Sequence, residues 1–194
     1  MQTEIILAGF GGQGILFAGQ LLAYAAMDAG REVTWIPSYG PEMRGGTANC
    51  TVIISEEEIG APTVRNPKAA LVFNLPSFDK YEPLVLPGGV LIANASLINR
   101  SFQRSDLTTV MLPANEIAEA LGDKRMTNMV MLGALLQKLP VLSFAAVEKT
   151  LQDHLPSRHK HLLAMNFEAL KRGAEFAERG VQTTIPNEQV TFNE

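Results

Sequence analysis

A glycine-rich turn between an apolar strand and an apolar helix is the feature that most constrains how this chain folds. Residues Glu4–Ala8 read EIILA, a β-branched apolar run typical of a buried strand. The next residues, Gly9–Gly14, have the pattern G-x-G-x-x-G, and Ile15–Ala29 has the apolar spacing of a helix. Because Glu32–Ile36 is again strand-like, this part of the chain predicts a βαβ unit and hence a Rossmann-like start.

The rest of the chain predicts a three-layer α/β/α sandwich with a helical C-terminal part. The further strand candidates are Thr47–Ser55, Ala69–Asn74, Val90–Ala95 and Thr108–Leu112. The further helix candidates are Pro76–Leu84, Ala114–Leu121, Met126–Leu139, Ser143–His154 and Lys160–Glu178. The hairpin-prone third strand favours a mixed sheet over a purely parallel one. We expect one domain over residues 1–178 and an extended tail over residues 179–194.

The net charge and the cysteine count exclude several classes of partner and cofactor. Sixteen Lys and Arg against 20 Asp and Glu give a net charge of -4, so no nucleic-acid partner is expected. Cys50 is the single cysteine, which excludes a disulfide framework or a thiolate-held metal cluster within this chain. Met1–Ala8 lacks the basic start of an export signal, and Ile15–Ala29 is too short and too polar to span a bilayer. We therefore expect a cytoplasmic protein with no membrane segment.

The glycine turn is the first half of a candidate cofactor-binding site. Glycines permit a tight turn, keep Cβ atoms away from a ligand and leave N–H groups open at a helix N-terminus, an arrangement that favours phosphate or another anion. The candidate residues are Gly9, Gly11, Gly12, Gln13 and Gly14. A full NAD or FAD site also needs an acidic residue at the end of the second strand, where this chain has Ile36, Pro37 and Ser38. A third reading is that the glycines serve only the packing of strand against helix.

The loop after the second strand, Ser38–Gly46, is the other half of this site. Loops at the carboxyl ends of strands line the ligand crevice of a doubly wound sheet, and we expect the first two strands to be neighbours, so that this loop faces the glycine turn. The candidate residues are Ser38, Tyr39, Arg44, Gly45 and Gly46. The Arg44 guanidinium suits a phosphate or a carboxylate, and the alternatives are an ion pair with Glu42 or a cation exposed at the surface.

Polar residues at two other strand ends, Asn74 and Asn94, either complete this crevice or cap the following turns. Cys50 is expected in the core, because no histidine is placed to activate it. The histidines His154, His159 and His161 lack the spacing of a metal site.

No catalytic residue is predicted, because the chain has no nucleophile elbow, no phosphate-loop lysine and no paired carboxylates. The residues present favour a ligand-contacting subunit whose chemistry is completed by partners. The alternatives are a self-contained NAD- or FAD-dependent oxidoreductase and a binding module that takes no part in turnover. The segment Met126–Leu139 is apolar almost all round, so it is either a central core helix or is covered by another chain.

Several collinear segments resemble a known family. They are Gly9–Ile15 (GFGGQGI), Pro37–Cys50 (PSYGPEMRGGTANC), Asn74–Tyr81 (NLPSFDKY), Pro87–Gly89 (PGG) and Asn128–Ala134 (NMVMLGA). Over residues 3–175 the chain resembles the gamma subunit of 2-oxoacid:ferredoxin oxidoreductases. The amino-acid sequence of the second loop is more similar to that of the 2-oxoglutarate and 2-oxoisovalerate members than to that of the pyruvate members.

The resemblance implies a function that this chain performs only in a complex. The family oxidatively decarboxylates a 2-oxoacid with thiamine diphosphate, transfers the acyl group to coenzyme A and passes electrons through iron–sulfur clusters to ferredoxin. In the multi-subunit forms, thiamine diphosphate and the clusters lie on partner subunits, of alpha, beta and delta type. The gamma-type domain is associated with the coenzyme A side of the reaction. Surfaces made for such partners would also let the isolated chain form a homodimer.

Overall fold

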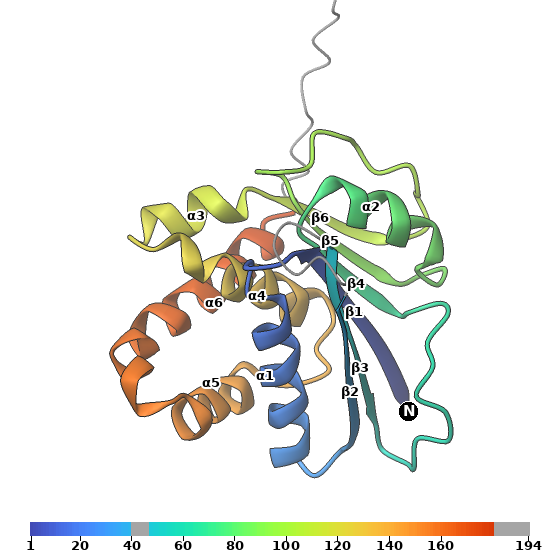
Figure 1. The fold of residues 1–194 in the computed structure, drawn as a ribbon. Coiled ribbons are helices and arrows are strands. Elements are labelled where there is room, and N and C mark those ends of the chain that lie inside the picture. Colours follow the sequence, from blue (N-terminus) through green and yellow to red (C-terminus); the bar gives the residue numbers. More distant parts are fainter. Residues whose placement is uncertain (40–46, 181–194) are drawn as a thin grey trace, which may run out of the picture.

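A six-stranded sheet forms the middle layer of the computed structural model, which describes residues 1–39 and 47–180 (Figure 1). The strand order is β2-β3-β1-β4-β5-β6. The strands are β1 (Gln2–Phe10), β2 (Glu32–Tyr39), β3 (Thr47–Ser55), β4 (Ala69–Val72), β5 (Val90–Asn94) and β6 (Thr108–Leu112). Strand β3 is antiparallel to β1 and to β2, whereas β1, β4, β5 and β6 are mutually parallel, so the mixed sheet is confirmed.

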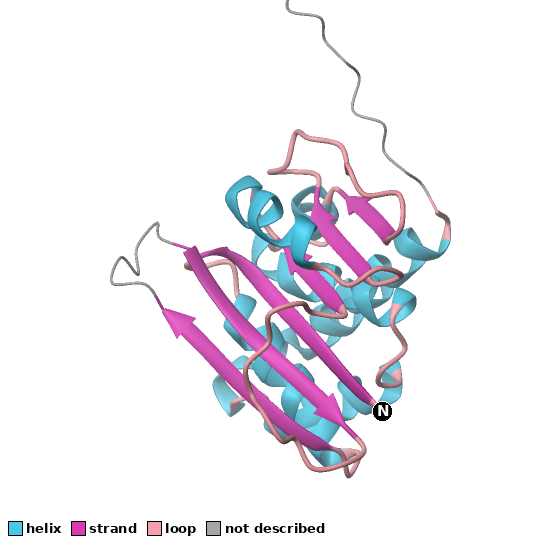
Figure 2. Cartoon of the chain, turned by 90° about the vertical axis from the view of Figure 1, so that its right-hand side faces the viewer, coloured by secondary structure: helices cyan, strands magenta, loops and turns pink. Residues whose placement is uncertain are grey.

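Helices lie on both faces of this sheet, with α2 over only part of the second face, which confirms the three-layer sandwich (Figures 1 and 2). One face carries α1 (Ile15–Asp28), α3 (Ala114–Ala120), α4 (Thr127–Lys138), α5 (Phe144–His154) and α6 (Leu163–Glu178), and the other carries α2 (Leu75–Tyr81). Short 3-10 turns span Glu82–Leu84, Lys124–Met126 and Ser157–Leu162. Of the helices described, none has the length and apolar character needed to cross a lipid bilayer.

Alternating side chains of β1 divide the interior into two cores. Ile5 and Leu7 belong to the larger core under α1 and α4, whereas Ile6 and Ala8 belong to the smaller core with Phe78 of α2. This follows from the two-residue period of a strand, whose successive side chains point to opposite faces. A strand buried on both faces reads as a continuous apolar run, which is why EIILA could be recognised.

The expectation that the first two strands are neighbours is wrong, because β3 lies between them. Gly9 of β1 and Tyr39 of β2 both pair with Ala48 of β3. Because β1 and β2 are each antiparallel to β3, they are parallel to each other, and their carboxyl ends still meet at one edge of the sheet. Two strand spacings separate these ends, about 10 Å.

Helix α4 is central to the larger core rather than covered by another chain. Every residue from Thr127 to Leu136 is buried. A Cβ atom built on Gly133 would overlap the backbone of Leu170 in α6, and one built on Gly173 would overlap the backbone of Val130 in α4. The two helix backbones are therefore in direct contact through these two glycines.

We expect Gly133→Ala to lower the free energy of unfolding by about 2 kcal/mol, because the added methyl group meets backbone that cannot move without separating α4 from α6. Helix propensity alone predicts the opposite sign, a gain of about 1 kcal/mol. Urea unfolding followed by circular dichroism decides between the two. Gly60→Ala is the matched control, since a Cβ there has nothing within 4 Å. Equal midpoints for both variants would contradict the close helix contact.

Candidate functional site

The candidate site lies where the connections of the sheet change direction. Helix α1 follows β1 and leads toward β2 over one face, whereas α2 follows the adjacent parallel strand β4 and leads toward β5 over the other face. Ligands of open α/β sheets bind at such a switch point, in the crevice outside the carboxyl ends of the two strands. The glycine turn after β1 and Asn74 after β4 flank this crevice.

The glycine turn is held in shape by the side chain of Gln13 and by close packing around Gly9. The Oε1 atom of Gln13 accepts a hydrogen bond from the backbone N–H of Phe10, at 2.6 Å. A Cβ atom on Gly9 would lie 2.5 Å from that oxygen and 2.7 Å from Cβ of Phe73, so only glycine fits there. Gly14 has a φ of 73°, which disfavours any other residue. The turn therefore requires glycine at position 9 for lack of space and at position 14 for its backbone conformation.

Helix α1 begins without a side-chain cap. Gly14 is its N-cap residue, and the first helical bond runs from the N–H of Ala18 to the carbonyl oxygen of Gly14, at 3.0 Å. The N–H groups of Ile15, Leu16 and Phe17 consequently have no acceptor within the helix. The first turn holds no acidic residue that would compete with an anion. Open N–H groups and the helix dipole together favour a phosphate at this end.

Asn128, on the first turn of α4, also contacts the glycine turn. Its Nδ2 atom donates to the carbonyl oxygen of Gly14, at 3.1 Å. Sequence reasoning missed this residue as part of the site. The available signal is one polar side chain that begins an otherwise apolar helical segment, and it does not indicate which turn the amide reaches.

The asparagines at the strand ends act as caps, the second of the two readings. Asn74 Oδ1 accepts from the N–H of Ser77 at 2.9 Å, and Asn94 Oδ1 accepts from the N–H groups of Ser96 and Ala114 at 3.2 Å each. Asn74 is 1% exposed, and its Nδ2 atom has no hydrogen-bond partner among the described residues. A donor is thus left over at the carboxyl end of β4.

The second loop is described only at its start. Ser38 and Tyr39 end β2 at the same edge as the glycine turn, and Ser38 is exposed. Arg44, Gly45 and Gly46 lie outside the described residues, as does the tail over 181–194, so their predicted roles stay predictions.

Lys80 of α2 is a cation that sequence reasoning did not single out. It lines a hollow of about 30 Å³ together with Ala8, Thr47 and Ser77. Its Nζ atom lies 4.9 Å from the ring centroid of Tyr81. The hollow opens beside the last residues of β1, so Lys80 adds a positive charge next to the crevice.

Cys50 is a core residue, as predicted. Its Sγ atom lies 3.8 Å from the carbonyl oxygen of Ile15, and burial raises the pKa of the thiol to about 12. His154 stacks on Tyr24 with ring centroids 4.8 Å apart, and its Nε2 atom lies 3.2 Å from Asp28. Within residues 1–39 and 47–180 no group of three or more His, Cys, Asp or Glu could hold a metal ion.

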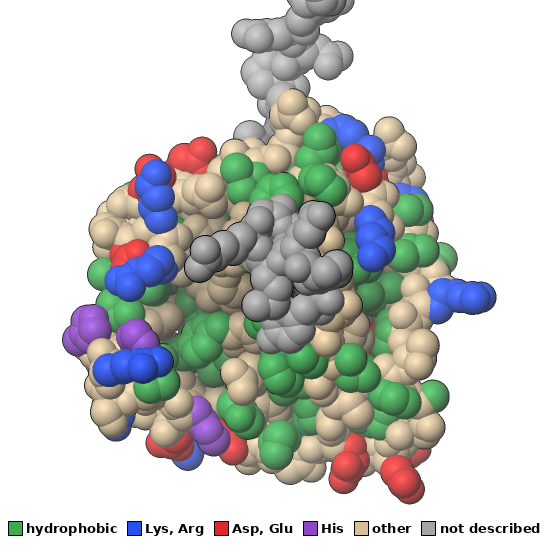
Figure 3. Space-filling model, in the orientation of Figure 1, with side chains coloured by type: hydrophobic (Ala, Val, Ile, Leu, Met, Phe, Trp, Pro, Cys, Tyr) green, Lys and Arg blue, Asp and Glu red, His purple; other side chains and the backbone are tan. Residues whose placement is uncertain are grey.

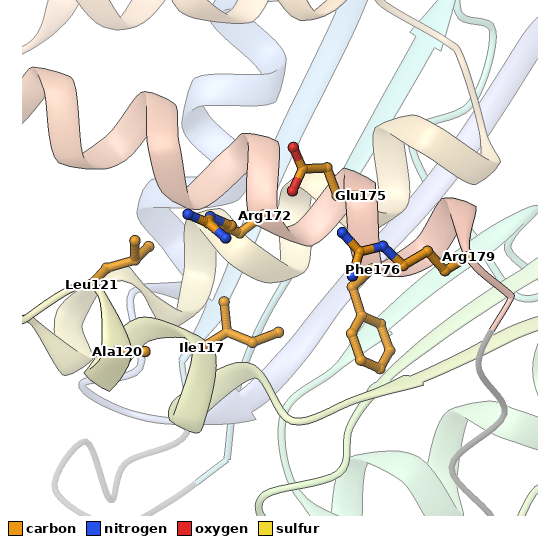
Figure 4. Close-up of a pocket in the computed structure, with 7 residues that line it drawn as sticks. All are labelled: Ile117, Ala120, Leu121, Arg172, Glu175, Phe176 and Arg179. Atoms are coloured by element: carbon orange, nitrogen blue, oxygen red, sulfur yellow. The ribbon is translucent and has the colours of Figure 1, made fainter.

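A larger cavity of about 280 Å³ lies between α3 and α6 (Figure 4). Its lining comprises Ile117, Ala120, Leu121, Arg172, Glu175, Phe176 and Arg179. None of these residues belongs to the glycine turn or to the second loop. Arg172 is already hydrogen-bonded to Glu168, at 2.7 Å.

The surface beside the glycine turn is apolar. Phe10, which lies within the turn, and Phe17, which follows it, are 36% and 37% exposed. Among the side chains coloured in Figure 3, hydrophobic ones gather in the lower part and on the right of this face, and charged ones lie mainly at the periphery. The turn is thus bordered by exposed aromatic side chains.

Known proteins are similar to this chain in sequence and in fold. The sequence profile of the pyruvate ferredoxin/flavodoxin oxidoreductase family matches residues 4–176. The chain belongs to that family. Ketoisovalerate oxidoreductase subunit VorA of Methanothermobacter thermautotrophicus is 36% identical over 93% of this chain, which spans only 38% of the length of VorA. The 2-oxoglutarate synthase subunit KorC of Methanocaldococcus jannaschii is 36% identical, with 86% of this chain and 91% of KorC aligned.

Solved structures agree with the family assignment. The gamma subunit of a keto/oxoacid ferredoxin oxidoreductase from Geobacter sulfurreducens matches with a TM-score of 0.81 and 29% identity, over 92% of this chain and 98% of that subunit. The 2-oxoglutarate:ferredoxin oxidoreductase from Magnetococcus marinus, with 2-oxoglutarate, coenzyme A and succinyl-CoA bound, matches with a TM-score of 0.82. Its identity is 24%, over 95% of this chain and 32% of that one, so this likeness concerns the fold alone.

We expect the Cys50 thiol of the folded chain to resist alkylation at pH 8, because a thiol with a pKa of about 12 is almost entirely protonated there and its sulfur is buried. Mass spectrometry after iodoacetamide treatment measures the labelled fraction. The same treatment in concentrated urea should label the thiol fully. Rapid labelling without urea would contradict the core assignment.

Proposed function

We propose that this chain is the gamma-type subunit of a multi-subunit 2-oxoacid:ferredoxin oxidoreductase, in which it provides the surface that contacts the diphosphate of coenzyme A. The reaction converts a 2-oxoacid and coenzyme A to an acyl-CoA and carbon dioxide, and the two electrons released reduce ferredoxin. The observation that carries the proposal is the uncapped N-terminus of α1 behind a glycine turn at the switch point of the sheet.

The groups at this crevice fit a diphosphate. Open N–H groups of the first turn of α1 and the helix dipole offer partial positive charge. The free donor of Asn74 and the ammonium group of Lys80 lie on the β4 side. Arg44, which lies outside the described residues, would supply a further guanidinium for a phosphate. Coenzyme A, when bound, would supply the thiol that accepts the acyl group.

The remaining cofactors fit partner subunits better than this chain. Thiamine diphosphate and iron–sulfur clusters belong to the proposed alpha, beta and delta-type subunits, because the lone cysteine of this chain is buried and cannot form the set of about four thiolates that a cluster needs. Ferredoxin would then be reached only through the complex. The names of the relatives point to a substrate of the 2-oxoglutarate or 2-oxoisovalerate type.

Reconstitution tests whether the chain is required for turnover. We expect 2-oxoacid-dependent ferredoxin reduction, followed by absorbance, when all subunits are combined, and less than about a hundredth of that rate when this chain is left out, since a bound acyl group then lacks its oriented acceptor. The chain alone should show no activity. Undiminished turnover without it would leave only a non-catalytic binding role.

Arg44→Ala should raise the coenzyme A concentration for half-maximal rate about tenfold in the assembled complex, because one charge-assisted hydrogen bond to phosphate is lost. The half-saturation by 2-oxoacid should stay within twofold. Arg31→Ala is the control, since Arg31 pairs with Glu56 at the other end of β2. An unchanged coenzyme A dependence would remove Arg44 from the proposed surface.

A further inference from the structure

Asn128 joins the first turn of the central helix α4 to the glycine turn. The side chain is 5% exposed. Its Nδ2 atom donates to the Gly14 carbonyl oxygen at 3.1 Å, and its Oδ1 atom accepts from the N–H of Met129 at 2.9 Å. Since both ends of the amide are engaged, its orientation is fixed. The two residues it connects, Gly14 and Asn128, are 114 positions apart in the sequence.

The Gly14 carbonyl oxygen therefore accepts two hydrogen bonds, from Asn128 and from the N–H of Ala18. A peptide unit is planar and trans, so its C=O and the N–H of the next residue point in opposite directions. Holding the Gly14 carbonyl oxygen toward α4 and the interior of α1 consequently directs the N–H of Ile15 away from them. This N–H is one of the groups that the helix leaves open.

Steric contact restricts the same peptide further. A Cβ atom on Gly14 would lie 2.5 Å from Nδ2 of Asn128, so the amide packs directly on the Gly14 α-carbon. Gln13 closes the other end of the turn through its bond to Phe10. Helix α4 is buried and in backbone contact with α6, so it offers a rigid support for this amide.

We propose that Asn128 is a positioning residue of the anion site: it orients the Gly14–Ile15 peptide so that the first turn of α1 presents its N–H groups to the diphosphate of coenzyme A. The inference rests on the proposed function. It adds the residue, outside both sequence motifs of the site, on which the geometry of the ligand-binding backbone depends. Preorganised donors bind an anion without the cost of ordering them at the moment of binding.

Steady-state kinetics of the assembled complex test the proposal. Asn128→Ala should raise the KM for coenzyme A about tenfold, with kcat and the KM for the 2-oxoacid within twofold of the parent. Asn166→Ala is the matched control. Asn166 is 4% exposed and its Nδ2 atom donates to the Leu162 carbonyl oxygen at 2.8 Å, so Asn166→Ala loses the same kind of bond in the first turn of α6. The control should keep the parent KM for coenzyme A.

Asn128→Asp separates orientation from packing, since it keeps the shape of the side chain and replaces the donor by a carboxylate. It should raise the KM for coenzyme A more than Asn128→Ala does, because the carboxylate repels both the Gly14 carbonyl oxygen and the incoming diphosphate. Equal KM values for Asn128→Asp and the parent would overturn the proposal.

Gly14→Ala distinguishes failure of this inference from failure of the proposed function. If Gly14→Ala leaves the KM for coenzyme A unchanged, the glycine turn does not bind coenzyme A and both are wrong. If Gly14→Ala raises this KM but Asn128→Ala behaves like Asn166→Ala, the glycine turn does bind coenzyme A and Asn128 has no positioning role. Hydrogen exchange covers variants that assemble poorly. The amide of Ala18, which donates to the Gly14 carbonyl oxygen, should exchange about tenfold faster in Asn128→Ala than in the parent or in Asn166→Ala. Equal Ala18 exchange rates in Asn128→Ala and Asn166→Ala would reject the positioning role.

Discussion

The antiparallel ladder between β1 and β3 determines where everything at the candidate site lies. It pairs Gln2–Phe10 with Thr47–Ser55 along the whole of both strands. Strand β1 is hydrogen-bonded on its other edge to β4, so it is held on both edges and buried on both faces. The glycine turn leaves this fully constrained strand, and its backbone therefore starts from a fixed position. The same ladder places Ala48 between Gly9 and Tyr39, which sets the separation of the two halves of the site.

The spacing of apolar residues was sufficient to predict the helices and strands. It does not determine which strands are hydrogen-bonded to each other. The apolar runs of β1, β4 and β5 are buried on both faces and were recognisable for that reason. Strand β1 nevertheless extends to Gln2 and Phe10, because ladder hydrogen bonds need backbone and not apolar side chains. The place of β3 between β1 and β2 depends on which edges meet in space, and no residue of Thr47–Ser55 specifies two partners by its own pattern.

The same distinction separates the predicted from the missed parts of the site. The glycine turn is local, so its spacing and the required conformation of Gly14 could be predicted from six consecutive residues. Asn128 reaches that turn only because α4 lies inside the larger core, and its apolar pattern fitted a helix covered by another chain equally well. That the Nδ2 atom of Asn74 has no partner among the described residues could not be predicted either. It becomes evident only in the structure, where the Oδ1 atom of the same amide accepts the capping bond from Ser77.

Under the proposed function, the distribution of polar groups explains how this chain would serve the reaction mainly through its backbone. The proposed contribution is a rigid backbone: a turn closed by Gln13, supported by Asn128 and continued by an uncapped helix. Rigid donors select an anion by position and lose little entropy when it binds. Exposed Phe10 and Phe17 border that turn, and aromatic side chains of this kind are enriched in protein interfaces. A partner seated on them would exclude water from the anion and strengthen each hydrogen bond to it, so assembly itself would complete the site.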